Sequence, residues 1–282
     1  MPTRLFASRS QFARDSKEWN RELSRLVAID LGAWSRKGSS RLLNEDYFTS
    51  ASIAIARGRT GAPLFLAVAD GLGGEEAGEW ASRMATQSMV ESLGARSVRR
   101  IESVPEDLLK DALMRAHGQV IEEGKSRAGH SGMSTTLTAA LVLWPRVVLI
   151  HAGDSRAYRL HAGTLEQLTI DHTVADVLVA RGQLSRDAVR SSRYRHILWN
   201  HLGGEGHLPE PQQAVALLEP GDGLLLTTDG LTDALAGSEF AEVASRPCSA
   251  HAVSHMLVEA AVARGARDDA TALFARFDPV VA

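Results

Sequence analysis

The chain has 282 residues, of which 44% are hydrophobic, and a formal net charge of −3. This hydrophobic fraction supports a packed core and excludes a disordered chain. The small net charge favours neither nucleic acid nor an anionic membrane as partner. The single cysteine, Cys248, excludes an intrachain disulfide, and every apolar run is too short to span a membrane. Because the charged N-terminus carries no apolar secretory signal, we expect a cytoplasmic protein.

The first third of the chain alternates strand-like and helical patterns behind a polar N-terminal extension, residues 1–24. Short apolar runs predict strands over residues 26–33, 47–56 and 64–69. The apolar spacing then changes to i, i+3, i+4, which predicts a helix over residues 76–93. A second helix is expected to begin at the N-cap residue Ser103.

The remaining chain predicts further strands, at 134–143, 146–152, 156–160, 214–218, 224–228 and 271–277, and a helix at 250–263. Residues 172–202 interrupt this order with a polar segment that contains a basic cluster, Arg190, Arg193, Arg195 and His196. We therefore expect antiparallel sheets covered by helices in one domain, residues 25–282, with residues 172–202 as an inserted segment.

Six aspartates stand at the ends of strand-like runs or in acidic turns: Asp46, Asp70, Asp154, Asp229, Asp233 and Asp268. A carboxylate at the end of a buried strand is costly unless a positive charge meets it. Several such ends that converge would form a cage of hard oxygen ligands, which suits Mg²⁺ or Mn²⁺. The pattern predicts a metal-dependent hydrolase.

The individual motifs also have simpler interpretations. The glycines after Asp70 predict a tight turn that exposes this carboxylate and the Gly71 carbonyl, yet they are equally compatible with an ordinary glycine turn. Asp229 has the alternative role of a helix N-cap, and Asp154 that of a residue in a two-residue hairpin loop. Arg41 could form a surface ion pair with neighbouring acids, or hold a phosphate through its two-pronged guanidinium.

Other catalytic chemistries find little support. His251 and His255 have the i, i+4 spacing of a helical zinc pair, but no glutamate follows His251 and the helix is expected to pack in the core. The serines carry no G-x-S-x-G nucleophile elbow. A dinucleotide-binding loop after Asp70 is excluded because Glu76 replaces the third glycine.

Seven motifs together are more specific than any one of them. In chain order they are Arg41-Leu-Leu-Asn-Glu-Asp46, Ala69-Asp-Gly-Leu-Gly-Gly74, Gly132-Met-Ser-Thr-Thr136, Gly153-Asp-Ser-Arg156, Leu168-Thr-Ile-Asp-His172, Thr228-Asp-Gly-Leu231 and Asp268-Asp-Ala-Thr271. This ordered set resembles the bacterial branch of the protein phosphatase 2C family, the metal-dependent Ser/Thr phosphatases. The resemblance covers about residues 26–278.

The resemblance implies an α+β fold, a four-layer α-β-β-α sandwich of two antiparallel sheets flanked by helices, with residues 172–202 as a flap beside the active site. It implies two core Mn²⁺ or Mg²⁺ ions, with Asp70 bridging both. Asp229 and Asp268 would complete the first site. The Gly71 carbonyl would bind the second, with Asp46 and Glu45 near it, partly through water.

The resemblance also assigns further roles. Asp154 and Asp233 match positions that help to hold a third ion, and Arg41 matches the phosphate-binding arginine. Many family members carry a histidine, the expected general acid, where this chain has Leu72. The general acid is therefore unassigned.

The implied activity is hydrolysis of phosphoserine and phosphothreonine by a hydroxide that bridges the two ions. The expected partners are a phosphorylated protein and the bacterial Ser/Thr kinase that the enzyme opposes, with the chain a monomer. The alternatives are a small-molecule phosphomonoesterase and a pseudophosphatase that binds without turnover. The flap arginines would read the phosphoprotein around the phosphate.

Overall fold

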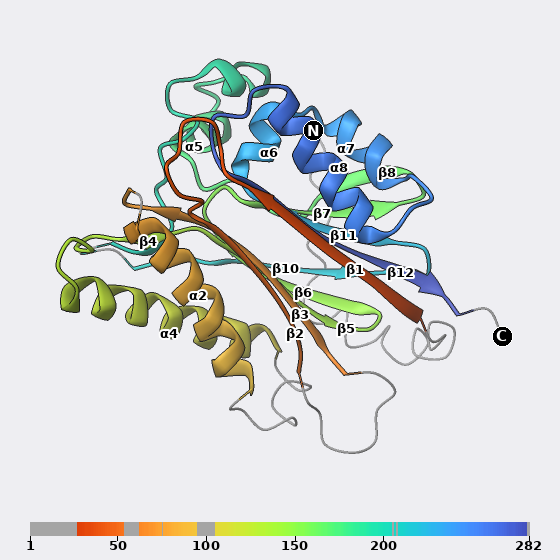
Figure 1. Cartoon of the computed structure of the whole chain (residues 1–282), viewed down its shortest axis with the longest axis horizontal. Coiled ribbons are helices and arrows are strands. Elements are labelled where there is room, and N and C mark those ends of the chain that lie inside the picture. Colours follow the sequence, from red (N-terminus) through yellow and green to blue (C-terminus); the bar gives the residue numbers. More distant parts are fainter. Residues whose placement is uncertain are drawn as a thin grey trace.

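The computed structural model describes residues 27–53, 62–74, 76–94, 105–204, 206 and 208–280. The predicted N-terminal extension, the end of the strand predicted at 47–56, and the N-cap Ser103 lie outside these residues. The described chain forms two antiparallel sheets between two layers of helices, as Figure 1 shows. The predicted α+β sandwich is confirmed.

The first sheet contains five strands in the order β1-β12-β11-β7-β8. Their bounds are β1 Val27–Arg36, β7 Arg156–His161, β8 Thr164–Gln167, β11 Gly223–Thr227 and β12 Ala270–Pro279. The helices α6 (Asp229–Ala234), α7 (Gly237–Ala244) and α8 (Ala250–Ala263) lie on its outer side (Figure 1). A buried cluster around Phe240, Leu257 and Phe274 joins these layers.

The second sheet contains seven strands: β10-β6-β5-β3-β4-β9 in order, with β2 also paired to β3. Their bounds are β2 Asp46–Ser52, β3 Leu64–Leu72, β4 Ser134–Thr135, β5 Leu137–Leu143, β6 Arg146–Ala152, β9 Leu202–Gly203 and β10 Gln212–Leu217. Helices α2 (Glu76–Gly94) and α4 (Pro105–Ser126) cover its outer side (Figure 1). Alternating apolar faces fill the space between the sheets, where Leu66, Leu149 and Phe277 are buried.

Several local predictions need correction. The strand predicted at 134–143 is two strands, β4 and β5, that flank Thr136, and the short elements β8, β9, α6 and α7 were not predicted. The link Gly153–Ser155 does not close a hairpin. It carries the chain from β6 in the second sheet to β7 in the first, so its two flanking strands never pair with each other.

Residues 172–202 form an insertion that contains one α-helix, α5 (Val174–Ala180), and one 3₁₀ helix, η1 (Arg186–Ser191). The two ends of this segment meet, because Thr173 forms an isolated β-bridge with Leu198. Among the described residues, no helix is long and apolar enough to cross a membrane.

Candidate metal centre

The register of β2 and β3 places two of the predicted ligands directly opposite each other. Asp46 is the cross-strand partner of Asp70, and both side chains are buried. Side chains directly opposite in an antiparallel pair lie on the same face, about 5 Å apart at Cβ. The backbone pairing therefore brings these two carboxylates together whichever rotamers their side chains adopt.

One oxygen of Asp46 is fixed by hydroxyl groups, and the other has no protein partner. Asp46 Oδ2 accepts hydrogen bonds from the hydroxyls of Thr228 (2.7 Å) and Thr271 (2.6 Å). Asp46 Oδ1 is buried without a hydrogen-bond partner among the described residues. Buried polar atoms are normally satisfied, so an orphaned carboxylate oxygen is a strong sign of a missing cationic partner.

Gly71 continues strand β3 rather than forming the tight turn predicted after Asp70. The chain turns two residues later, where Gly73 and Gly74 have φ angles of 126° and 79°. Gly71 lacks a side chain for a different reason: a Cβ there would lie 2.1 Å from the carbonyl oxygen of Gly78 in α2. Because this helix packs so closely on the strand, the start of α2 lies beside Glu45. A Cβ on Gly78 would lie 2.8 Å from the Glu45 side chain.

Asp229 is the first residue of α6 and is separated from strand β11 only by Thr228. The N-cap of that helix is Thr228, so the alternative role of Asp229 as N-cap is wrong. Asp229 Oδ1 is the second carboxylate oxygen that is buried without a hydrogen-bond partner in the described part of the chain. Asp46 and Asp229 thus each present one buried carboxylate oxygen that a cation could bind.

Asp268 and Asp269 precede β12 and have different surroundings. Asp269 is buried and accepts backbone N–H groups from Gly38 (2.8 Å) and Glu45 (2.7 Å), which fixes the loop that leads into β2. Asp268 is partly exposed and accepts two hydrogen bonds from Arg41. Both oxygens of Asp268 are thus held by Arg41 at a partly exposed position, whereas Asp269 is a buried structural anchor.

Arg41 lies at the centre of the acidic loop in a two-pronged contact. Its Nε and Nη2 donate to Asp268 at 2.7 and 2.9 Å, and its Nη1 donates to Glu45 Oε2 at 3.1 Å. Burial opposes its charge, but the neighbouring carboxylates outweigh burial and raise the pKa of Arg41. The arginine predicted to bind phosphate thus holds two of the predicted metal-site acids.

Charge repulsion is built into the cluster. Burial, followed by the neighbouring charges of Asp46 and Asp229, raises the pKa of Asp70 well above its ordinary value. Burial is also the main reason that the pKa values of Asp46 and Asp154 are raised well above theirs. Such crowding of acids favours either protons or cations.

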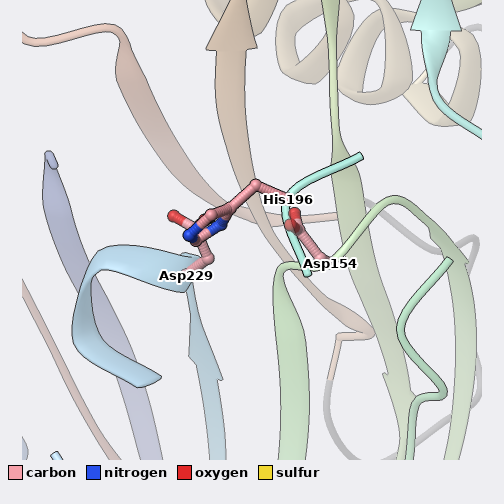
Figure 2. A group of neighbouring side chains, drawn as sticks. All are labelled: Asp154, His196 and Asp229. Carbon is pink, nitrogen blue, oxygen red and sulfur yellow. The ribbon is translucent and has the colours of Figure 1, made fainter. Parts of the chain in front are cut away.

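Asp154, Asp229 and His196 meet at one point from three separate elements (Figure 2). Their nearest ligand atoms all lie within 4.8 Å of one another. Asp154 lies on the link between the sheets, Asp229 begins α6, and His196 belongs to residues 172–202. Hydrogen bonding to Asp229 is the main cause that raises the pKa of His196. The sequence grouped His196 with the basic cluster and gave no sign that it would reach the aspartates.

Asp233 lies one turn further along α6 and faces the same histidine. Its Oδ2 is 3.2 Å from His196 Nε2 and 3.6 Å from Arg195 Nη2. Arg190 donates to the Asp233 carbonyl at 2.7 Å. Three members of the predicted basic cluster therefore contact this helix. The fourth member, Arg193, is exposed and lies over the ring of Tyr194.

The donor set fits divalent metal ions. It consists mainly of carboxylate oxygens, two of them orphaned, on strands, links and a helix start at one end of the sheets, with one imidazole nitrogen from His196. Hard oxygen donors of this kind suit Mg²⁺ and Mn²⁺.

The comparisons with known proteins agree with this geometry. The family model described as Protein phosphatase 2C matches residues 36–262. The Ser/Thr phosphatase Stp of Listeria welshimeri is 31% identical over 206 residues, which cover 73% of this chain and 81% of that protein.

Solved structures match over most of the chain. The Mycobacterium tuberculosis phosphatase PstP/Ppp superimposes with a TM-score of 0.77 at 30% identity, over 90% of this chain and all of that one. The catalytic domain of PstP in complex with two manganese ions gives a TM-score of 0.74 at 28% identity, over 89% and 99% of the two chains. This chain belongs to the protein phosphatase 2C family. The predicted class of enzyme, a metal-dependent Ser/Thr protein phosphatase, is confirmed.

Proposed function

We propose that this chain removes phosphate from phosphoserine and phosphothreonine in proteins at the buried aspartate cluster. Asp70 would bridge two Mn²⁺ or Mg²⁺ ions, with Asp229 and Asp268 on the first. The Gly71 carbonyl and Asp46 would serve the second, and Glu45 would reach it through water. The observation that carries this proposal is the pair of orphaned oxygens, Asp46 Oδ1 and Asp229 Oδ1.

The third ion would lie beside Asp154. The structure groups Asp154 with Asp229 and His196, whose ligand atoms lie within 4.8 Å of one another. Asp233 instead lies against His196. For Asp233 to bind the third ion, His196 would have to move away or contact the carboxylate and the ion together. A nitrogen donor among carboxylates still suits Mn²⁺ and disfavours Mg²⁺, which prefers oxygen.

The residues of this chain would divide the chemistry among them. The bound ions supply charge neutralisation and lower the pKa of coordinated water. The guanidinium of Arg41 can turn from Asp268 to hold two phosphate oxygens, because the two anions have similar spacing for a two-pronged contact. Thr228 and Thr271 keep Asp46 Oδ2 occupied, so that only Oδ1 is directed to a ligand. Leu72 supplies no proton, so the general acid stays unassigned.

A phosphoprotein substrate is favoured over a small phosphometabolite. A hollow of about 530 Å³ beside Asp154 and Asp229 is lined in part by Arg186, Arg190 and Arg195. These basic side chains belong to residues 172–202, where a large phosphorylated partner would contact them. The enzyme would reverse a bacterial Ser/Thr kinase in the cytoplasm and act as a monomer.

The test is hydrolysis of p-nitrophenyl phosphate with Mn²⁺, Mg²⁺ or EDTA, followed by a phosphopeptide panel. We expect activity with Mn²⁺, none in EDTA, and release of phosphate from phosphoserine and phosphothreonine peptides. Activity that persists in EDTA would contradict the metal assignment. Hydrolysis of small phosphomonoesters without any phosphopeptide would favour the metabolite alternative, and metal binding without turnover would indicate a pseudophosphatase.

A further inference from the structure

One sequence motif has no role in the catalytic scheme above: Leu168-Thr-Ile-Asp-His172, which leads into residues 172–202. The acidic residue of this motif, Asp171, binds the residue that follows the link Gly153–Ser155 between the two sheets. Asp171 accepts hydrogen bonds from Arg156 Nε at 2.8 Å and from Nη2 at 2.6 Å, and Arg156 is the last residue of the motif that contains Asp154. The two motifs are therefore joined to each other.

The buried side chain of His172 makes a second connection to the same link. The backbone N–H of His172 donates to the Gly153 carbonyl at 2.7 Å, and the Gly153 N–H donates back to His172 Nδ1 at 3.2 Å. Gly153 has a φ of 120°, and a Cβ there would lie 2.5 Å from Thr136 Cβ. This reciprocal pair fixes the residue immediately before Asp154.

His172 also holds the far end of residues 172–202. Asn200 Nδ2 donates to His172 Nδ1 at 2.8 Å, and the Trp199 N–H donates to the His172 carbonyl at 3.0 Å. The orientation of the Asn200 amide is determined by Glu210, whose N–H donates to Oδ1 and whose carbonyl accepts from Nδ2.

These neighbours specify the protonation of the ring. Both groups at Nδ1, the Gly153 N–H and the Asn200 amide, are donors, so Nδ1 must be the unprotonated nitrogen. Burial lowers the pKa of His172 to about 4, which agrees with a neutral ring. The rings of His151 and Trp199 pack on it at centroid distances of 4.7 and 4.9 Å.

We propose that His172 is a positioning residue: its Nδ1 joins the Asp154 link to both ends of the flap, residues 172–202, and so keeps Asp154 and His196 within reach of one ion. This inference rests on the proposed function, because it concerns the ion beside Asp154. His196 lies only four residues before Asn200, so a shift of the flap base would move its imidazole away from Asp154 and Asp229. Residues that orient metal ligands in this way typically change metal affinity about 10- to 100-fold when they are replaced.

The test compares two amide substitutions at one position. The Oδ1 of asparagine can take the place of His172 Nδ1 as an acceptor, whereas glutamine extends its amide toward the Nε2 position and leaves both donors unmet. Mn²⁺ binding is followed by electron paramagnetic resonance of the free ion, a measurement that does not depend on turnover. We expect His172→Gln to weaken Mn²⁺ binding at the weakest site about tenfold and to leave binding at the tighter sites unchanged. We expect His172→Asn to bind Mn²⁺ at the weakest site nearly as tightly as the wild type.

Equal Mn²⁺ titrations for His172→Gln and His172→Asn would overturn the proposal, since a role in packing alone does not distinguish the two amides. If neither variant folds, Asn200→Ala provides the second measurement, because it removes one donor at Nδ1 and one contact to the flap end. A weaker last Mn²⁺ step in Asn200→Ala supports the proposal, and an unchanged step overturns it. A wild-type protein without Mn²⁺-dependent hydrolysis would instead contradict the proposed function, which separates the two failures.

Discussion

Replacing Asp70 by asparagine should abolish activity and at the same time stabilise the metal-free protein. Asp70 and Asp46 are cross-strand partners, and burial together with neighbouring aspartates raises the pKa of Asp70. At a separation of about 5 Å and an effective dielectric constant near 20, two unit charges repel by about 3 kcal/mol, an upper bound because the pair can take up a proton. We therefore expect the free energy of unfolding of Asp70→Asn in EDTA to exceed that of the wild type by about 1–3 kcal/mol.

The measurement is thermal unfolding, followed by circular dichroism in EDTA and in excess Mn²⁺. In a chain of this size each kcal/mol shifts the melting temperature by about 2–4 °C. In EDTA the Asp70→Asn variant should melt above the wild type. In Mn²⁺ at about a thousand times its dissociation constant the order should reverse. Binding then adds about 4.1 kcal/mol to the stability of the wild type, more than the variant gains in EDTA, and the variant loses this binding.

The pH dependence has a definite sign. Because the folded-state pKa of Asp70 is raised, its stability cost is present near neutral pH and disappears as the carboxyl group takes up a proton on acidification. The advantage of Asp70→Asn in EDTA should therefore shrink as the pH is lowered from neutral toward the ordinary carboxyl range. Comparing variant with wild type at each pH removes the contributions of all other titrating groups.

Asp269→Asn is the matched control. The chemical change is the same and burial raises the pKa of this carboxyl group too, but its oxygens are held by backbone N–H groups rather than facing other aspartates. Asp269 accepts two backbone N–H groups, so its replacement should destabilise the protein in EDTA by about 1–3 kcal/mol. The reasoning is refuted if Asp70→Asn melts below the wild type in EDTA. It is also refuted if the variant keeps more than about a tenth of the turnover, which is a loss of only about 1.4 kcal/mol.

Four further substitutions test the surrounding residues. Arg41→Ala should weaken the binding of phosphosubstrate and inorganic phosphate by about 1–3 kcal/mol without weakening Mn²⁺ binding; an unchanged KM together with unchanged phosphate inhibition would remove Arg41 from the site. Asp154→Ala should raise the Mn²⁺ concentration needed for half-maximal turnover while two tightly bound ions remain, as counted by metal analysis after desalting. Arg193→Ala, at the exposed position of the basic cluster, should slow phosphoprotein dephosphorylation more than p-nitrophenyl phosphate hydrolysis. Arg195→Ala, which loses the contact to Asp233, should slow both reactions, and equal profiles for the two arginine variants would contradict this division.

The elements with strong local patterns were predictable. The helix predicted at 250–263 is α8, and the strands predicted at 146–152 and 64–69 are β6 and the greater part of β3. Apolar periodicity indicates the buried face of α8, whereas the continuous apolar runs of β3 and β6 indicate strands that are buried on both faces. The short elements β8 and β9 escaped prediction because two to four residues carry no measurable period.

The contacts of the basic cluster in residues 172–202 were not predictable from the sequence. The basic cluster was expected to face a phosphoprotein. In the structure Arg190, Arg195 and His196 stay wholly or partly exposed but contact Asp229 or Asp233 in α6. Charge along the sequence does not reveal which carboxylate a cation meets, since the two segments lie more than thirty residues apart. Arg193 keeps the predicted outward position, and its role in substrate reading stays a prediction.

The sequence by itself determined which chemical groups are present and in what order: aspartates at strand ends, one arginine among acids, and glycines beside them. These are local properties, because residue type and periodicity are read without knowing what lies opposite. Tertiary structure decided which groups meet. The register of β2 and β3 pairs Asp46 with Asp70, and the link Gly153–Ser155 crosses between sheets and so carries Asp154 to Asp229. Strand register and sheet crossing depend on contacts between distant residues, which a local pattern cannot encode.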